Sequence, residues 1–155
     1  MEAERRAELI ASYRAGVAAV NKALEEATHE DLDRQPPHGW SARMVVHHLA
    51  DSETNSYLRL RKLLAEDSPS IQGYDEAEFA RVLHYDRPIA HDLAVFTAVR
   101  ASSAELLDRL TEDDWRRTGT HSESGPYSVE DWLRIYAEHA VAHADQIRRA
   151  RAGQA

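Results

Sequence analysis

Residues 128–147 read SVEDWLRIYAEHAVAHADQI, and this stretch decides which fold the chain can form. Its large apolar side chains recur at spacings that suit a helix: Val129, Trp132, Leu133, Tyr136 and Ile147. An α-helix turns by roughly 100° per residue, so these positions fall on one face. Ser128 is a residue type that helix N-caps favour. The stretch therefore predicts an amphipathic helix from Ser128 to about Ala150.

The rest of the chain shows the same periodicity in three further segments: Ala3–Ala27, Ser41–Glu66 and Ile89–Leu110. Consecutive prolines in DRQPPHGW, residues 33–40, end the first segment, because proline cannot continue a helix. A short helix is expected at Asp75–Leu83, inside the long connection that follows the second segment. Strand-like alternation is absent, and GTHSESGPY, residues 119–127, is expected to be a loop.

These segments together predict an all-α fold: a four-helix bundle with a long crossover between its second and third long helices. A short internal echo agrees with this arrangement. THEDLDR begins at Thr28 and TEDDWRR begins at Thr111, and each is followed by a loop, an aromatic residue and a serine. The two halves are interpreted as helix pairs related by a pseudo-twofold axis.

Length and composition narrow the function classes. At 155 residues, the chain is expected to form one domain, residues 1–155. The absence of cysteine excludes disulfides, thiolate metal ligands and a cysteine nucleophile. The formal charge of −8 repels phosphate, so no nucleic-acid partner is expected. Residues 1–16 lack the apolar core of a signal peptide, and no apolar stretch is long enough for a bilayer, so we expect a cytoplasmic protein without a membrane partner.

Two histidines of the last helix, His139 and His143, point into its apolar face. The mean direction of the large apolar groups falls between them, within about 50° of each. The two side chains stand one helical turn apart, which is the spacing at which both can reach one ion.

On the second long helix, the neighbours His47 and His48 diverge by about 100°, so only one of them can face the core. The inner stripe of this helix consists of Val45, Leu49, Ser52, Ser56, Leu60 and Leu63. His48 lies at the edge of this stripe, whereas His47 points nearly opposite, beside Arg43 and Asp51. His48 is therefore the inward histidine.

His48, His139 and His143 are thus predicted to meet inside the bundle as three neutral imidazoles. Such a set suits zinc, nickel or a similar divalent ion. Three protein ligands leave one position for water or substrate, which is typical of a catalytic site. The alternative is that the rings only pack in the bundle, because histidine pairs four residues apart are common on helices. Burying three imidazoles without partners is costly, and this favours the metal.

No acid stands where the general base of an HEXXH zinc protease would be, because Ala140 follows His139. The acids nearest His48 in the sequence, Asp51 and Glu53, are the candidates for catalytic carboxylates. Asp51 could orient a metal ligand through a hydrogen bond, and Glu53 lies on the inner half of its helix. Structural roles suit both residues equally well.

The other aromatic residues and histidines are assigned to packing or to solvent. Tyr57, Trp132 and Tyr136 could line a pocket, but aromatic residues at helical spacing more often form the core. The remaining histidines lie in turns, in the crossover or in a loop, where we expect them to be solvated: His29, His38, His84, His91 and His121.

With these residues placed, the chain resembles the DinB-like superfamily of metal-binding four-helix bundles, especially its YfiT-like branch. The resemblance runs through nearly the whole chain and is carried by GWSARMVVHHLADSE (residues 39–53), PSIQGYDE (69–76) and YSVEDWLRIYAEHAVAHADQI (127–147). It implies that His48, His139 and His143 are the family's three metal ligands. It also implies a bundle with a long second connection, and frequent dimers.

The resemblance further implies a metal-dependent enzyme. Some members of the family transfer low-molecular-weight thiols such as bacillithiol or mycothiol to electrophiles, some isomerise maleylpyruvate, and many have no assigned reaction. Our leading hypothesis is therefore a metal-dependent thiol S-transferase with a small-molecule substrate and a thiol co-substrate, acting as a homodimer. The alternatives are a hydrolase that uses a metal-bound hydroxide, and a non-catalytic dimeric bundle.

Overall fold

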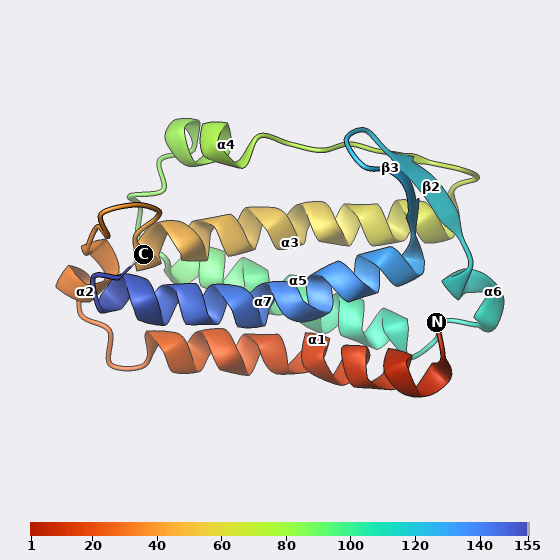
Figure 1. Cartoon of the computed structure of the whole chain (residues 1–155), viewed down its shortest axis with the longest axis horizontal. Coiled ribbons are helices and arrows are strands. Elements are labelled where there is room, and N and C mark those ends of the chain that lie inside the picture. The colour runs from red at the N-terminus through yellow and green to blue at the C-terminus, as the bar shows by residue number, and fades with distance from the viewer. Residues whose placement is uncertain (155) are drawn as a thin grey trace.

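Four long helices form the frame of the molecule in the computed structural model, which describes residues 1–154 (Figure 1). They are α1 (Ala3–Leu24), α3 (Ala42–Ala65), α5 (Ala90–Leu107) and α7 (Val129–Arg151). Their bounds agree with the four helices expected from apolar periodicity, to within three residues at each end. The predicted four-helix bundle is confirmed.

Short elements connect the long helices. They are α2 (His29–Asp33), β1 (Ser70–Ile71), α4 (Glu76–Val82), α6 (Glu112–Trp115), β2 (Thr118–His121) and β3 (Gly125–Ser128). The short helix α4 lies inside the range predicted for it.

The helix starts are fixed by side chains that accept hydrogen bonds from free backbone N–H groups. Ser41 caps α3, accepting from the amide of Met44, and Ser128 caps α7. Thr28 and Thr111 each form a reciprocal capping box with the aspartate three residues later, at the starts of α2 and α6. The internal echo in the sequence therefore corresponds to two equivalent capped turns.

The crossover follows from the directions of the helices. Figure 1 shows α3 and α5 running in the same direction, and α1 and α7 running opposite to them. In the bundle, α1 packs on α7 and α5, and α3 packs on α5 and α7. Because α3 ends at the far end of the bundle from the start of α5, residues 66–89 return along α3. This connection covers α3 with β1, α4 and the segments beside them.

A small sheet corrects the expectation of a loop at residues 119–127. β2 and β3 form an antiparallel hairpin, and β1 pairs in parallel with β2, with Ser70 opposite Thr120. Gly119 permits this pairing, because a Cβ there would lie 2.5 Å from the carbonyl oxygen of Pro69. Strands this short show no alternation in sequence, and the parallel pair joins segments far apart in the chain.

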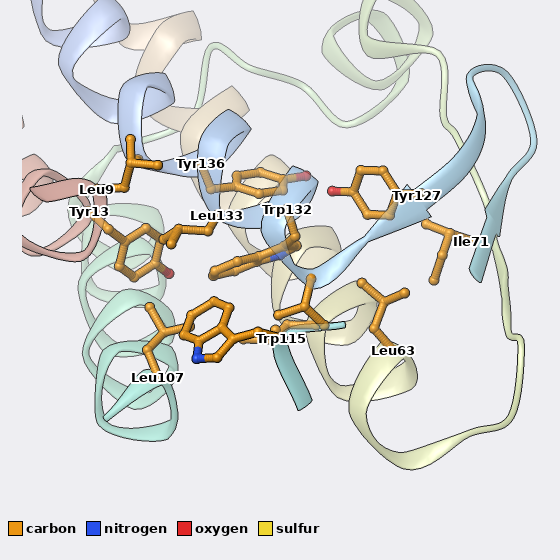
Figure 2. Packing of buried hydrophobic residues seen from close by; sticks show 13 residues of the cluster. Leu9, Tyr13, Leu63, Ile71, Leu107, Trp115, Tyr127, Trp132, Leu133 and Tyr136 are labelled. Atoms are coloured by element: carbon orange, nitrogen blue, oxygen red, sulfur yellow. The ribbon is translucent and has the colours of Figure 1, made fainter. Parts of the chain in front are cut away.

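The apolar core is divided into two clusters. The cluster at the hairpin end, shown in Figure 2, includes Leu9, Tyr13, Leu63, Trp115, Tyr127, Trp132 and Tyr136. The cluster at the other end includes Val20, Val45, Leu49, Phe96, Ala140 and Ile147. Between them, the middle of the bundle contains buried polar residues: Ser52, Glu53, Ser56, Arg100 and Ser103. The bundle thus carries a polar layer at mid-height.

None of the described helices combines the length and apolar composition that a bilayer-spanning segment needs.

Candidate metal centre

The structure brings His48 of α3 together with His139 and His143 of α7. One nitrogen from each ring can be chosen such that all three lie within 4.8 Å of one another. The ring centroids are 4.4 Å apart for His139 and His143, and 4.7 Å apart for His48 and His143. These are the three residues that helix phase selected.

The spacing within the α7 pair fits a single ion. The Nε2 atoms of His139 and His143 lie 3.1 Å apart. Two imidazole nitrogens that bind a tetrahedral zinc ion at 2.0–2.1 Å would be separated by about 3.3 Å. Both rings could therefore bind one ion without a large movement of either ring.

A hydrogen bond from His143 to Gln146 fixes which nitrogen of His143 is free. The Nδ1 atom of His143 lies 2.7 Å from Oε1 of Gln146, so Nδ1 carries the hydrogen and donates it. The Nε2 atom of a neutral His143 then presents a lone pair to the cluster. Such a hydrogen bond behind the ring is usual for metal-binding histidines. Sequence reasoning missed Gln146, although its position three residues after His143 was a usable signal.

Burial keeps the three imidazoles in the neutral form that binds metals. It lowers the pKa of His48 to about 3, with a smaller effect from His143. Burial also places the pKa of His139 well below its ordinary value, and the neighbouring His143, His48 and Arg100 act in the same direction. The pKa of His143 is lowered by burial and partly raised by Gln146.

The cluster has a closed side and a side that meets solvent. His48 is 1% exposed, and the Trp40 ring lies 5.1 Å from its ring. The side chain of His139 is 17% exposed, and His143 is half-buried. The Nδ1 atoms of His48 and His139 are buried without a hydrogen-bond partner among the described residues. A donor set of three unprotonated rings with partial access fits a divalent ion with an open position.

Neither candidate carboxylate reaches the three rings. Asp51 accepts a hydrogen bond of 2.6 Å from the hydroxyl of Tyr85. Glu53 is fully buried and paired with Arg100, and its carboxylate lies 4.0 Å from Nδ1 of His139, beyond hydrogen-bond distance. Burial raises the pKa of Glu53, while Arg100 opposes this shift. The structure thus places Asp51 and Glu53 in supporting networks.

Of the three aromatic candidates, Tyr136 alone adjoins the cluster. Its ring lies 5.7 Å from the ring of His139. Trp132 is buried, and its indole N–H donates a hydrogen bond to the backbone oxygen of Ser56. The guanidinium of Arg61 stacks on the ring of Tyr57. The expectation that these residues mostly pack holds for Trp132.

His47 differs from the sequence prediction. It does point away from the other rings, but it is fully buried, because the crossover covers this face of α3. Its Nε2 atom lies 2.9 Å from the carbonyl oxygen of Arg87, and its Nδ1 atom contacts the carboxylate of Asp92. The sequence did not show that α5 would supply Asp92 to this side. His47 therefore links α3 to both the crossover and α5.

The remaining histidines lie outside the cluster. Four of them are exposed, as expected: His29, His38, His84 and His91. His121 is half-buried beside Tyr127 on the hairpin, with 5.6 Å between the ring centroids, so it is less solvated than predicted.

Comparisons with known proteins, by sequence and by structure, agree on one protein family. A model of the DinB superfamily matches residues 12–147. The solved structure of YfiT from Bacillus subtilis, described provisionally as a metal-dependent hydrolase with an unusual four-helix bundle topology, is similar with a TM-score of 0.86 and 30% identity. That match covers 100% of this chain and 91% of YfiT.

Two curated relatives carry provisional names as metal-dependent hydrolases. The relative from Oceanobacillus iheyensis is 40% identical over 109 residues, which is 70% of this chain. The relative from Halalkalibacterium halodurans is 31% identical over 111 residues, which is 72% of this chain. The matched region spans 63% and 65% of these two relatives, less than two thirds of their length.

Proposed function

This chain belongs to the DinB superfamily, and on that premise we propose that it is a metal-dependent enzyme in which His48, His139 and His143 hold a divalent ion. Zinc and nickel are the ions we propose, because three neutral imidazoles form a borderline ligand set.

One observation carries the proposal: the two Nε2 atoms of His139 and His143 face each other at 3.1 Å. Gln146 holds the hydrogen of His143 on the far side of the ring, so Nε2 of His143 has only a lone pair to offer. A hydrogen on Nε2 of His139 would satisfy this pair alone and leave His48 unexplained. An ion would take a lone pair from one nitrogen of each of the three rings.

A divalent ion beside the three rings would lower the pKa of a thiol or a water molecule in its open position, supplying a nucleophile near neutral pH. We propose that the nucleophile is a low-molecular-weight thiol and that the reaction transfers it to an electrophilic small molecule. The thiol proton passes to solvent, a carbon–sulfur bond forms, and the leaving group departs with its electron pair.

The surroundings of the cluster favour a thiol because no free carboxylate among the described residues is placed as a general base. Glu53 is tied to Arg100, and Asp51 is tied to Tyr85. A thiol with an ordinary pKa near 8.5 needs less help to ionise than water does. The residues of the chain would then bind and orient the thiol, while Trp40 shields His48 from solvent.

Hydrolysis by activated water is the second candidate. It is favoured by the provisional names of the relatives and of YfiT. The same three histidines would serve both reactions, so the distinction rests on the co-substrate.

The first experiment measures the metal content of untagged protein and of its His143→Ala variant. We expect close to one equivalent of divalent metal in the wild type and a loss of most of it in the variant. His91→Ala is the matched control, because His91 is exposed on α5, away from the cluster. If all three proteins contain the same trace of metal, the metal-dependent enzyme is ruled out and the non-catalytic bundle is the hypothesis that is left.

Activity then separates the two reactions. Metal-loaded protein is assayed for conjugation of bacillithiol and of mycothiol to monobromobimane, and for hydrolysis of p-nitrophenyl acetate without thiol. We expect metal-dependent conjugation that His143→Ala abolishes. Ester hydrolysis without any metal-dependent conjugation would replace the transferase by the hydrolase.

A further inference from the structure

A line of polar side chains leads from the three histidines along α3. His48, Ser52, Ser56 and Arg59 follow at spacings of four, four and three, which places them on one face of the helix. Ser52 is 5% exposed and Ser56 is fully buried. Polar residues on a buried helix face need partners, and most residues between the two apolar clusters find theirs in the bundle.

Three tyrosines from other elements meet the far end of this line. The hydroxyl of Tyr136, on α7, accepts a hydrogen bond of 3.0 Å from Nη1 of Arg59. Figure 2 shows the hydroxyls of Tyr136 and of Tyr127, on β3, directed toward each other. Tyr74, in the crossover, lies with its ring centroid 6.0 Å from the guanidinium carbon of Arg59. Helix, hairpin and crossover thus converge on one arginine.

Several polar atoms in this place have no hydrogen-bond partner among the described residues. They are the Oγ of Ser56, the hydroxyls of Tyr74 and Tyr127, and Nε of Arg59. Leaving a buried polar group unpaired costs about 1–3 kcal/mol, so native proteins rarely gather four of them. Tyr127 is only 4% exposed, so bulk solvent does not satisfy its hydroxyl.

Arg59 also differs from the buried arginines of the bundle in its charge balance. Arg6, Arg43 and Arg100 each form an ion pair with a carboxylate. Among the described residues, no carboxylate oxygen lies within 4.0 Å of a nitrogen of Arg59, which instead donates to Tyr136 and to the carbonyl of Gln72. Burial raises the pKa of Glu76, and the nearby Arg59 opposes this shift without forming an ion pair with Glu76.

The tyrosine hydroxyls are suited to donate to an anion. Burial raises the pKa of both Tyr74 and Tyr127 above the ordinary value, so both keep their hydrogen at neutral pH. A cation with unpaired phenolic donors around it is an arrangement that binds oxyanions.

We propose that Arg59, with the hydroxyls of Tyr74 and Tyr127, binds an oxyanionic end, carboxylate or phosphate, of the small molecule that the metal centre activates. This inference rests on the proposed function. Tyr136 links the two ends of the site, since its ring adjoins His139 and its hydroxyl reaches Arg59. The ligand therefore carries its anionic group about one tyrosine side chain away from the atom that meets the three histidines.

Three matched thiols test this inference by binding alone. They are 6-mercaptohexanoate, 6-mercaptohexyl phosphate and the neutral 6-mercaptohexanol, titrated calorimetrically into zinc-loaded protein. We expect at least one anionic thiol to bind about tenfold or more tightly than the alcohol, which is the effect of a charged hydrogen bond. The tighter of the two anions identifies the oxyanion.

The variants are Arg59→Gln and Arg59→Lys, with Arg61→Gln as the matched control. Arg61 lies on the same helix as Arg59, and Arg61→Gln removes the same charge as Arg59→Gln. The guanidinium of Arg61 stacks on the ring of Tyr57, away from this line of residues. Arg59→Gln is expected to erase the preference for the anionic thiol, and Arg59→Lys to restore part of it. Because Arg59 also bonds the crossover at Gln72, the melting temperature of each variant is measured without ligand.

Adipate, which has carboxylates but no thiol, separates this inference from the proposed function. Adipate binding that Arg59→Gln removes, together with no binding of the neutral 6-mercaptohexanol, would support the anion site and contradict the thiol reaction. Equal binding of all three thiols to the wild type would overturn the anion site and leave the metal chemistry intact. The anion site would also be overturned if the preference for the anionic thiol survived in Arg59→Gln but was lost in Arg61→Gln.

Discussion

Gln146 shows how one uncharged side chain can set the chemistry of a neighbouring histidine. Its Oε1 accepts from Nδ1 of His143, which orients the ring and leaves a lone pair on Nε2, which faces His139. Removing such a partner typically lowers metal affinity 10–100-fold, because the ring loses its orientation and part of its basicity. The residue lies outside the cluster itself, so its effect is on affinity and not on the number of ligands.

We therefore predict that Gln146→Ala weakens zinc binding by about tenfold or more, while Gln146→Glu, which keeps an acceptor, retains it. Competition with a chromophoric chelator measures both affinities. The melting temperature of the metal-free variants shows whether the fold is intact. Zinc affinity equal to wild type in Gln146→Ala would show that the hydrogen bond does not support a metal ligand.

At the scale of helices, the approach of α1 to α7 depends on Gly16. A Cβ at this position would lie 2.7 Å from Cβ of Ala140 and 2.8 Å from Nη2 of Arg100. Neither atom can move easily. The Cβ of Ala140 is fixed to the backbone of α7, and the guanidinium of Arg100 is held by Glu53 and by the carbonyl oxygen of Tyr13. The buried guanidinium thus occupies the space that a side chain at position 16 would need.

We predict that Gly16→Ala destabilises the protein by about 1–2 kcal/mol, although alanine favours helices over glycine. Denaturation in urea measures the change. Ala15→Gly, on the exposed face of α1, is the control and should lose about 0.5–1 kcal/mol through helix propensity alone. A stabilised Gly16→Ala protein would mean that α1 and α7 do not approach this closely.

The helices were predictable from sequence because each carries its own signals. Ser41 and Ser128 stand at the starts of α3 and α7, and apolar periodicity gives their inward faces. The β1–β2 pair was not predictable, because it depends on a contact between Ser70 and Thr120 that no local pattern records. Non-local pairing of very short strands is decided by tertiary structure.

In the candidate site, too, some features were predictable from the sequence and others were not. Helix phase was sufficient to bring His48 to His139 and His143, since the bundle fixes which faces meet. It could not place Glu53 against Arg100, or His47 against Asp92, because these partners come from α5 after the crossover has returned. The expectation of a DinB-like chain is confirmed, whereas roles that depend on partners from distant segments follow only from the folded structure.

For the whole molecule, the buried histidines link stability to pH when the metal has been removed. The pKa of His48 is about 3 in the folded protein, compared with 6.5 for an unperturbed histidine. The unfolded chain therefore binds more protons than the folded chain between these values, so stability is full above pH 6.5 and is lost as the pH falls. His139 contributes with the same sign. The loss from His48 alone is on the order of 5 kcal/mol over the full window.

We predict that chelator-treated protein loses about 2 kcal/mol or more of unfolding free energy between pH 7.5 and pH 5.0, a range above the ordinary pKa of most carboxyl groups. Zinc-loaded protein should be more stable at each pH and should lose stability only at lower pH, because rings that hold an ion must release it before they take a proton. Urea denaturation of both forms at the two pH values measures this difference. Because His143→Ala removes one titrating ring, the metal-free variant should show a shallower pH dependence than the wild type. If metal-free wild type is as stable at pH 5.0 as at pH 7.5, the three rings are not buried as neutral imidazoles.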